Sequence, residues 1–528
     1  MIRIFHEFED LTMSEGQKFV PQQDVLTFYK GSTIFVTGVT GFLGHVLLSK
    51  LLCSCPDIKK IYILIREKRG KDIWTRFQEI FDQPVFEKAK KCCPDYTSIV
   101  TPIRGDCLKP NLGISDTDRD LLQEEVNIIF HVAATVRFDA PLRDAVYINI
   151  RSTSDLLDIA KGIKNLQVFV HVSTAFSYCA EHNTIEEKVY EPPMFPQNIL
   201  SIVDHLNDTI LDRITPRLLG PYPNTYVLTK AIAESLCLHK NTGIPITVFR
   251  PAIVISTAEE PIPGWINNTY GPTGIVAAAG IGLLRTLNAD KNCKANVVPC
   301  DYVINAMIAA AWYTAETWKT FKQNTSDEDP AKMLRVPIFN YSSTETNNSL
   351  TWKAFMEGNE KFEQEIPFSY SMWAYSLTLN KYKFVHQVYV IFLHLLPALI
   401  VDSIAVLCGK EPRLWESYQK VHKLTNVISY FSTRQWIIPH ENVKKLWNCL
   451  SPGDKQIFQF NLENLDWKTY FKNHVFGIRT YIIKDKETTI PYALKKRKKL
   501  IFTHYAVISL FLCLISYFCL RLLQVVFK

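Results

Sequence analysis

The stretch "TIFVTGVTGFLGHVLL", residues 33–48, decides the fold. It begins as a β-branched apolar run typical of a buried strand, and after a turn it continues as an apolar run typical of a helix. Gly38, Gly41 and Gly44 separate the two runs in a GxxGxxG spacing. Glycines at such a turn let the backbone approach a ligand closely, and the helix N-terminus attracts a pyrophosphate. The stretch therefore predicts a dinucleotide-binding α/β fold.

The pattern repeats along the chain. Short apolar runs recur as "KIYILIR" (60–66), "NIIFHVAA" (127–134), "QVFVHVST" (167–174) and "PITVFRPA" (245–252), with helical segments between them. This alternation predicts βαβ units around a doubly wound parallel sheet of the Rossmann type. After residue 355 it stops, and aromatic-rich helical segments follow. We therefore expect a nucleotide-binding domain over 28–320, a substrate-region segment over 333–355 and a mostly helical domain over 356–485.

Composition excludes several classes of function. The 528 residues are 47% hydrophobic and 21% charged, as in a folded protein rather than a disordered one. The formal net charge of +7 owes much to "KKRKK", residues 495–499, and no basic stripe interleaved with aromatics indicates a nucleic-acid partner. The 13 cysteines show no paired CxxC spacing, so we expect no metal site.

One long apolar run predicts a membrane helix. Residues 501–520 contain no Lys, Arg, Asp or Glu, and about 20 helical residues span a bilayer's ~30 Å hydrocarbon core. The basic residues 495–499 precede this run, so we expect a single-pass C-terminal helix with the catalytic part in the cytosol. A second run, 388–401, is broken by Pro397 and closed by Asp402. It is short for a span and predicts an interfacial, re-entrant or core helix.

Two sets of residues carry chemistry. The second predicted strand ends at Arg66, where an NAD site places an acid, and Lys68 follows; cations there suit the 2′-phosphate of NADPH. Tyr226 and Lys230 stand four residues apart, hence on one helix face. A nearby ammonium stabilises a phenolate, so we expect Tyr226 to exchange a proton near neutral pH.

These motifs occur in a recognisable order together with Ser173 and Thr174 at a strand end and Asn149 in "VYINIRST". GxxGxxG, strand-end Ser-Thr and YxxxK resemble the extended short-chain dehydrogenase/reductases. Closer still, "TGVTGFLG" (37–44), "STAFSYC" (173–179), "PNTYVLTKAIAE" (223–234), "FRPAIV" (249–254), "PGWINNTYGPTG" (263–274) and "DWKTYFKNHVFGIRTYIIKD" (466–485) look like the alcohol-forming fatty acyl-CoA reductases. The likeness covers about residues 28–485.

The resemblance implies an activity. It predicts that long-chain fatty acyl-CoA is reduced to a primary alcohol with two NADPH, through a hemithioacetal and an aldehyde. Thr174, with Ser173 beside it, would hydrogen-bond the substrate carbonyl, and Tyr226 would give the proton. Lys230 would hold phenol and ribose, and Asn149 would support Lys230 through water.

The resemblance also implies a cofactor site and a location. In chain order, the residues of this site would bind the pyrophosphate, the 2′-phosphate and the adenine, form a wall of the site, and contact the ribose and the nicotinamide. They are Gly38, Thr40, Gly41, Phe42, Leu43, Gly44, Arg66, Lys68, Asp106, Ala133, Ala134, Lys230, Pro251 and Ile253. The expected partners are long-chain acyl-CoA and the bilayer of the endoplasmic reticulum or peroxisome, and the oligomeric state is open.

Three other functions were weighed. An acyltransferase or thioesterase would need an HxxxxD or GxSxG motif, and the chain has neither. A membrane-bound extended dehydrogenase acting on a sterol shares the glycine turn and YxxxK, but "PGWINN" and the helical domain argue against it. A non-catalytic scaffold would not need Thr174, Tyr226 and Lys230 together.

Overall fold

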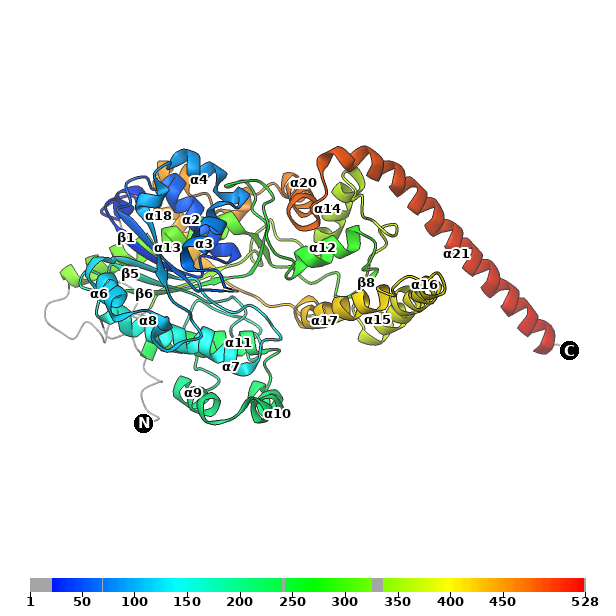
Figure 1. Ribbon diagram of the computed structural model, residues 1–528, viewed down its shortest axis with the longest axis horizontal. Helices are drawn as coiled ribbons and strands as arrows, with labels where there is room; N and C mark the ends of the chain where they lie inside the picture. Colours follow the sequence, from blue (N-terminus) through cyan, green and yellow to red (C-terminus); the bar gives the residue numbers. More distant parts are fainter. Residues whose placement is uncertain (1–20, 69, 240–242, 325–335, 527–528) are drawn as a thin grey trace.

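A seven-stranded sheet forms the centre of the computed structural model, which describes residues 21–68, 70–239, 243–324 and 336–526 (Figure 1). Residues 333–335 of the predicted substrate-region segment lie outside these ranges. The strands follow the order β10–β6–β5–β4–β1–β2–β3, and every neighbouring pair is parallel. They are β1 (Thr33–Thr37), β2 (Lys60–Ile65), β3 (Val100–Arg104), β4 (Ile128–His131), β5 (Val168–Val172), β6 (Ile246–Pro251) and β10 (Ile338–Tyr341).

The strand order reverses between β1 and β4, which confirms the predicted doubly wound fold. β1 and β5 are buried along their whole length, as the unbroken apolar runs require for a sheet covered on both faces. In open α/β sheets, ligands bind outside the carboxyl ends of the strands at such a reversal. The GxxGxxG turn follows β1 and therefore lies at this point.

Helices cover both faces of the sheet (Figure 1). On one side lie α2 (Phe42–Ser54), α3 (Ile73–Phe81), α4 (Glu87–Cys92) and the long α13 (Cys300–Asn324). On the other lie α6 (Asp116–Glu125), α7 (Leu142–Val146), α8 (Ser152–Lys161) and α11 (Thr225–His239). The 176–225 insertion adds α9 (Pro196–His205) and α10 (Asp208–Leu219) below α7 and α11.

The short elements α1 (Val25–Tyr29) and α5 (Tyr96–Ile99) belong to the same part of the chain, and between β6 and α13 lie β7 (Ile253–Ile255), α12 (Pro272–Gly280), β8 (Thr286–Asn288) and β9 (Val297–Pro299). β7 pairs with β9, and β8 pairs with β11 (Thr378–Asn380), so the reductase half and the C-terminal half share a small sheet.

The C-terminal helices divide between two places. α14 (Trp352–Glu365), α15 (Lys383–Val390), α16 (Leu396–Leu407), α17 (Leu414–Ser432) and α20 (Trp467–Gly477) form a separate layer beside the sheet (Figure 1). In contrast, α18 (Glu441–Cys449) and α19 (Pro452–Ile457) return to the sheet. There Asn442 donates to the Ile338 carbonyl of β10 at 2.9 Å, and the Tyr341 hydroxyl donates to the Phe460 carbonyl at 2.6 Å. The region after residue 356 therefore contributes both to the helical layer and to the cover of the central sheet.

Among the described residues, two helices are long and apolar enough to cross a membrane. The last helix, α21 (Ile490–Val526), extends away from the rest of the protein (Figure 1). The other is a continuous helix of 25 residues, Lys383–Leu407, in which α15 and α16 are joined by a π-helical turn at Ile391–Leu395. The helix continues past Pro397 because the π-helical turn precedes it, and the Leu393 carbonyl, which Pro397 cannot bond, accepts a hydrogen bond from Arg285.

Candidate functional site

The glycine turn has the geometry of a phosphate cradle. Gly38 has φ of +78°, and a Cβ there would lie 2.6 Å from the Ala133 backbone nitrogen. A Cβ on Gly44 would lie 2.3 Å from the Gly38 carbonyl oxygen. Gly41 precedes α2, and no side chain caps the first N–H groups of that helix. These donors fit a pyrophosphate, which the positive end of the helix dipole also favours.

The rest of the turn is shaped by packing. Phe42 stacks on Trp265 with ring centroids 5.5 Å apart, and Leu43 packs against the core, whereas Thr40 is exposed. Ala133, with Ala134 next to it, faces the turn where β4 ends; the Ala133 N–H donates to the Thr37 hydroxyl at 3.3 Å. The predicted cofactor wall is thus in contact with the glycines, because β1 and β4 are neighbouring strands.

A cationic site lies at the ends of β2 and β3. Arg66 Nη1 lies 3.9 Å from Asp106 Oδ1, so the two residues predicted for the 2′-phosphate and the adenine are neighbours. Arg76, on α3, donates to the Arg66 carbonyl. Burial and the charge of Arg66 lower the pKa of Arg76. Lys68 and Lys71 are joined by backbone hydrogen bonds in a short antiparallel bridge beyond β2. Arg76 was missed from the sequence because it lies ten residues beyond Arg66, across a loop.

Tyr226 and Thr174 meet at the carboxyl end of β5. Burial raises the pKa of Tyr226 to about 12, and the interaction of its phenol with the Thr174 hydroxyl only partly opposes this shift. The phenol is thus a protonated group held beside a second hydroxyl, an arrangement that can donate a proton to an oxyanion.

Lys230 lies one turn further along α11 and is 2% exposed. Its ammonium donates to the Val172 carbonyl at 2.6 Å, and burial lowers its pKa to about 8 although Glu234 raises it. We expected the Lys230 ammonium to lie at the phenol and to lower the pKa of Tyr226. Instead, the Val172 carbonyl at the end of β5 accepts its hydrogen bond, and the pKa of Tyr226 is raised. Burial and the charge of Lys230 lower the pKa of nearby His171.

Glu234 anchors a buried network behind the site. Its carboxylate accepts hydrogen bonds from Ser173, from Ser177 at 2.6 Å and from Arg250 Nη2 at 2.6 Å. The side chains of Arg250 and Glu234 are 0% and 3% exposed. The Ser173 hydroxyl is therefore turned toward Glu234, whereas Thr174 turns toward Tyr226. Glu234 was missed although it lies four residues after Lys230, a spacing that places both on one helix face.

Asn149 connects α11 to the neighbouring layer. It lies in a π-helical turn, Tyr147–Arg151, of a kind frequent at functional sites. Its side-chain amide donates to the Thr229 hydroxyl at 2.9 Å and accepts from the Thr135 N–H at 2.9 Å. Asn149 is thus one residue away from Lys230 through Thr229. This contact fits a role in positioning that helix.

An aromatic pocket opens beside these groups. Phe138 lies 5.6 Å from Tyr226 and 5.9 Å from Phe431, measured between ring centroids. Phe431 belongs to α17, so the C-terminal layer reaches the site. Phe431 also contacts Trp436 and, at 5.3 Å, Phe176.

The pocket is lined by Phe176, Phe431, Trp436 and Ile253, with Lys294 and Arg434 among its polar residues. Ile253 follows Pro251 at the end of β6, which places the predicted nicotinamide flank on the pocket wall. No sequence signal marked Phe431 or Trp436.

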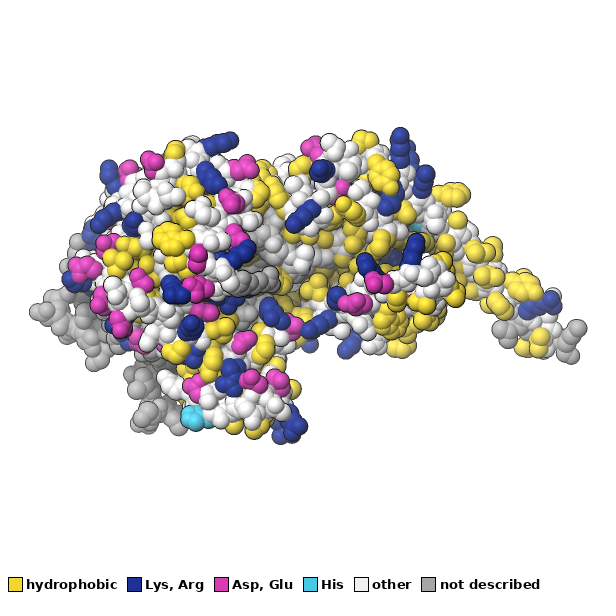
Figure 2. Space-filling view, in the orientation of Figure 1, with side chains coloured by type: hydrophobic (Ala, Val, Ile, Leu, Met, Phe, Trp, Pro, Cys, Tyr) yellow, Lys and Arg dark blue, Asp and Glu magenta, His cyan; other side chains and the backbone are white. Residues whose placement is uncertain are grey.

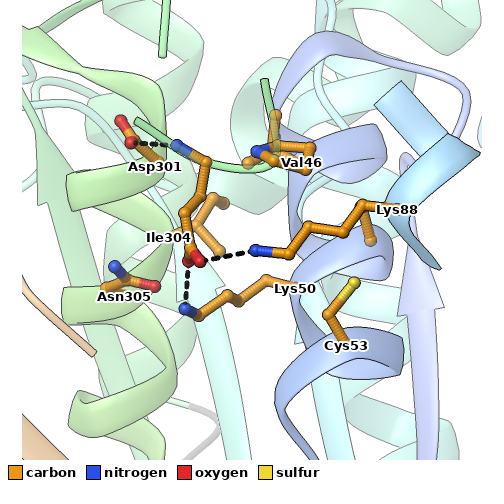
Figure 3. Close-up of a pocket in the computed structure, with 10 residues that line it drawn as sticks. Val46, Lys50, Cys53, Lys88, Asp301, Ile304 and Asn305 are labelled. Atoms are coloured by element: carbon orange, nitrogen blue, oxygen red, sulfur yellow. Dashed lines mark hydrogen bonds and ion pairs between the residues drawn. The ribbon is translucent and has the colours of Figure 1, made fainter. Parts of the chain in front are cut away.

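A second pocket, between α2 and α13, holds a different kind of cluster (Figure 3). Lys50 and Lys88 point toward one carboxylate, that of Glu260, with Lys88 at 2.9 Å. Lys50 also donates to the Ile457 carbonyl at 2.6 Å, and Asp301 accepts from the Glu260 N–H at 3.0 Å. These bonds tie together the 258–261 loop, α2 and the returning C-terminal segment, which is a structural role.

The fold and the site define the class of protein. A doubly wound parallel sheet, an open glycine turn at its topological switch and a YxxxK helix beside a strand-end threonine belong to an extended short-chain dehydrogenase/reductase, an oxidoreductase that uses a nicotinamide cofactor.

Comparisons with known proteins agree with this class. A family model described as "Male sterility protein" matches residues 36–307, and a second with the same description matches 393–485. The chain is 38% identical over 497 residues to fatty acyl-CoA reductase wat of Drosophila melanogaster, covering 94% of this chain and 93% of that one. It is 34% identical over 473 residues to fatty acyl-CoA reductase 1 of Mus musculus, covering 90% and 89%. The chain belongs to the fatty acyl-CoA reductase family.

Solved structures share the fold. The reductase domain of a non-ribosomal peptide synthetase from Mycobacterium tuberculosis matches with a TM-score of 0.55 at 15% identity, covering 87% of this chain and 93% of that one. The terminal R domain of the myxalamid biosynthetic pathway matches with a TM-score of 0.51 at 17% identity, covering 85% and 91%. Both confirm the reductase-type architecture.

Proposed function

We propose that this protein reduces a long-chain fatty acyl-CoA to the primary alcohol, consuming two NADPH and releasing coenzyme A. The observation that carries the proposal is the Tyr226 phenol, which interacts with the Thr174 hydroxyl and is connected through Phe138 and Phe431 to an aromatic pocket that Ile253 also lines. The relatives named fatty acyl-CoA reductase, similar over nine-tenths of the chain, support the acyl-CoA substrate.

NADPH is the proposed cofactor, because two arginines meet where its 2′-phosphate would lie. Arg66 and Arg76 come from different elements, and burial together with the charge of Arg66 disfavours the charged form of Arg76, a cost that a bound anion would offset. The glycine turn would hold the pyrophosphate and Asp106 the adenine. When bound, NADPH would supply the hydride.

The protein's own groups would manage the oxyanion. Hydride addition to the thioester carbonyl makes a hemithioacetal oxyanion, which Thr174 can hydrogen-bond and Tyr226 can protonate. The raised pKa of Tyr226 keeps the phenol protonated before this step. Collapse of the hemithioacetal breaks the C–S bond and releases coenzyme A as the thiol. The remaining aldehyde carbonyl meets the same two donors, and a second hydride and proton give the alcohol.

Lys230, Ser173 and Asn149 would have supporting roles in the proposed catalytic set. Lys230, which is buried beside the Val172 carbonyl of β5, would hold the ribose and provide a positive charge near the site. Ser173 and Asn149 contact Glu234 and Thr229 rather than Tyr226, so we propose that both position the machinery.

The walls of this pocket are chemically suited to an apolar chain and an anionic head. Phe176, Phe431 and Trp436 supply apolar walls, whereas Lys294 and Arg434 supply cations for the phosphates of coenzyme A. Thr344 also lines the pocket, which supports the proposed substrate-region segment 333–355.

We further propose that α21 crosses the membrane of the endoplasmic reticulum or peroxisome once, with residues 501–520 in the hydrocarbon core and the reductase part in the cytosol. The apolar part of α21 that could cross a membrane is not covered by any other described part of the protein. The basic residues 495–499 precede it, as the positive-inside rule requires.

The stoichiometry of the reaction tests the proposal. Purified protein in detergent, supplied with NADPH and long-chain acyl-CoA, should consume about two NADPH per acyl-CoA, and fatty alcohol should dominate even with an aldehyde trap present. Tyr226→Phe is the matched control for background oxidation. One NADPH per acyl-CoA with trapped aldehyde as the main product would refute the alcohol-forming reaction. Turnover of sterols but not of acyl-CoA would instead favour the alternative of a sterol dehydrogenase.

A further inference from the structure

The helix Lys383–Leu407 presents an unusual surface. Most of its apolar side chains face outward: Leu399 is 58% exposed, Ile404 54% and Leu407 86%. Figure 2 shows hydrophobic side chains gathered over α15 to α17 and along α21, at the same end of the molecule. Soluble proteins rarely leave so large an apolar surface uncovered.

The opposite side of this helix is fixed to the protein by polar contacts. His386 hydrogen-bonds the Thr286 hydroxyl at 3.0 Å, and His394, 1% exposed, hydrogen-bonds His422 of α17 at 3.0 Å. Asp402 accepts hydrogen bonds from the first N–H groups of α17, including that of Trp415 at 2.8 Å. The helix therefore has a narrow polar stripe that binds α17 and β8, and a broad apolar face that the described part of the chain leaves mostly uncovered.

The neighbour α17 excludes a transmembrane orientation. α16 and α17 are joined by a short loop and run side by side, with Asp402 at the N-terminus of α17 and His394 opposite His422. α17 carries Glu416, Lys420 and Lys423, and Lys423 forms an ion pair at 2.7 Å with Asp139 of the reductase part. If the helix crossed a bilayer, these charges would lie at the same depth, at a cost of several kcal/mol each.

The apolar face is nevertheless continuous with the membrane helix. Arg285 donates to the Leu393 carbonyl in the middle of the 383–407 helix, and its guanidinium lies 5.6 Å from the Trp373 ring. The Trp373 indole in turn hydrogen-bonds His504, near the start of the apolar part of α21, at 2.9 Å. The two helices thus meet at one point of the domain, and a bilayer that contains α21 from this point reaches the 383–407 face.

We propose that the helix Lys383–Leu407 lies in the plane of the membrane and inserts its apolar face into one leaflet, as a second and monotopic contact beside α21. This inference rests on the proposed membrane insertion of α21. Lys383 and Lys410, at the two ends of the helix, are placed to reach anionic headgroups.

The contact has a consequence for the substrate. α17, which runs beside this helix, ends with Tyr430 and Phe431, and both belong to the aromatic cluster at the pocket. The proposed platform therefore fixes the pocket at a set distance from the leaflet, where long-chain acyl-CoA partitions and where the alcohol would be released.

Depth measurement on the full chain tests the proposal. The exposed cysteines Cys92, Cys408, Cys513 and Cys519 are replaced by serine, and a nitroxide is attached to Leu399→Cys or, as the matched control, to Lys420→Cys. The protein is reconstituted into phosphatidylcholine vesicles containing phosphatidylserine. The accessibility of each label to oxygen and to a water-soluble nickel chelate then gives its depth, and the unsubstituted parent gives the background.

The platform predicts a label at 399 about 5–10 Å below the phosphates and a label at 420 in water. Equal exposure of both labels to the nickel chelate would overturn it, and so would a label at 399 near the bilayer centre. NADPH oxidation by the same vesicles is recorded separately, so failure of the reductase proposal is distinguishable. Leu399→Asp combined with Ile404→Asp should raise KM for long-chain acyl-CoA several-fold and leave KM for a short-chain acyl-CoA unchanged.

Discussion

Replacing Arg66 by alanine should move the cofactor preference of this reductase from NADPH toward NADH. The 2′-phosphate is the only chemical difference between the two cofactors, so any group that contacts it changes their relative affinity alone. Arg66 follows β2, the Arg76 guanidinium on α3 donates to its backbone carbonyl, and Asp106 Oδ1 lies 3.9 Å from Arg66 Nη1.

The expected magnitude follows from the exposure of these groups. A hydrogen bond to a charged partner contributes about 1.5–3 kcal/mol, which corresponds to roughly tenfold to 150-fold in affinity. The Arg66 side chain is 40% exposed, and solvent screening moves its contribution to the lower end of that range. We therefore expect Arg66→Ala to raise KM for NADPH about 10- to 30-fold and to leave KM for NADH nearly unchanged.

Arg76 allows a sharper form of the test. Its pKa is lowered by burial and by the charge of Arg66, and a phosphate between the two guanidinium groups would remove that repulsion. Arg76→Ala should therefore also weaken NADPH, and the double variant should lose less than the product of the two single effects. Arg104→Ala is the matched control, because Arg104 stands at the end of β3 in an ion pair with Glu67 and has no proposed contact with the cofactor.

The assay is kcat/KM for both cofactors with one acyl-CoA, together with direct titration of cofactor binding. If Arg66→Ala lowers kcat/KM for NADPH and NADH by the same factor, Arg66 supports the fold rather than the phosphate. If Arg76→Ala leaves NADPH unchanged, the second guanidinium has no role in cofactor choice.

Three further changes are expected to have measurable effects. Tyr226→Phe should fold and bind NADPH but lose about 10²- to 10⁴-fold in kcat, and more than a tenth of the normal rate would require another proton donor. The buried Lys230 has a pKa lowered to about 8, so its ammonium is present below that pH; turnover should fall as pH rises through about 8, and a profile flat to pH 10 would contradict its role. Glu234→Gln leaves Arg250 buried without its ion pair and should destabilise the fold by about 3–5 kcal/mol. Thermal unfolding measures this loss, and Tm equal to the parent would show the network to be dispensable.

The central sheet was predictable because its strands are continuous apolar runs and its glycine turn permits few alternatives. Arg66 lies beside Asp106 because β2 and β3 are neighbouring parallel strands that end at one edge. Gly38 and Ala133 meet for the same reason, at the carboxyl ends of β1 and β4. These relations depend on strand order alone, which the alternation of elements encodes.

Side-chain direction was less accessible. Ser173 and Thr174 are adjacent, and successive residues of an extended chain point to opposite sides, so both could not face one substrate. The structure directs Ser173 to Glu234 and Thr174 to Tyr226. Lys230 was expected at the phenol, but the free carbonyl of Val172 accepts its hydrogen bond, and no sequence pattern reports which carbonyl is free.

Contacts across long stretches of sequence were not predictable at all. Phe431 and Trp436 reach the pocket because the chain returns from α17 to the sheet, and that path depends on tertiary packing. Arg250 meets Glu234 only when β6 is placed next to α11. Periodicity describes which face of an element is buried, but not which distant residue will cover it.

The return of α18 and α19 to the sheet also sets an order of events during synthesis. The Tyr341 hydroxyl at the end of β10 donates to the Phe460 carbonyl, which is synthesised 119 residues later. At ~5–20 residues per second, this edge of the sheet therefore stays uncovered for roughly 6 to 24 s. During this interval Ile338 and Phe339, buried in the finished protein, lack the α18 side of their cover. The β10 edge is therefore a part of the sheet that is completed late in synthesis. Its apolar α21 emerges only after the segment that closes the fold.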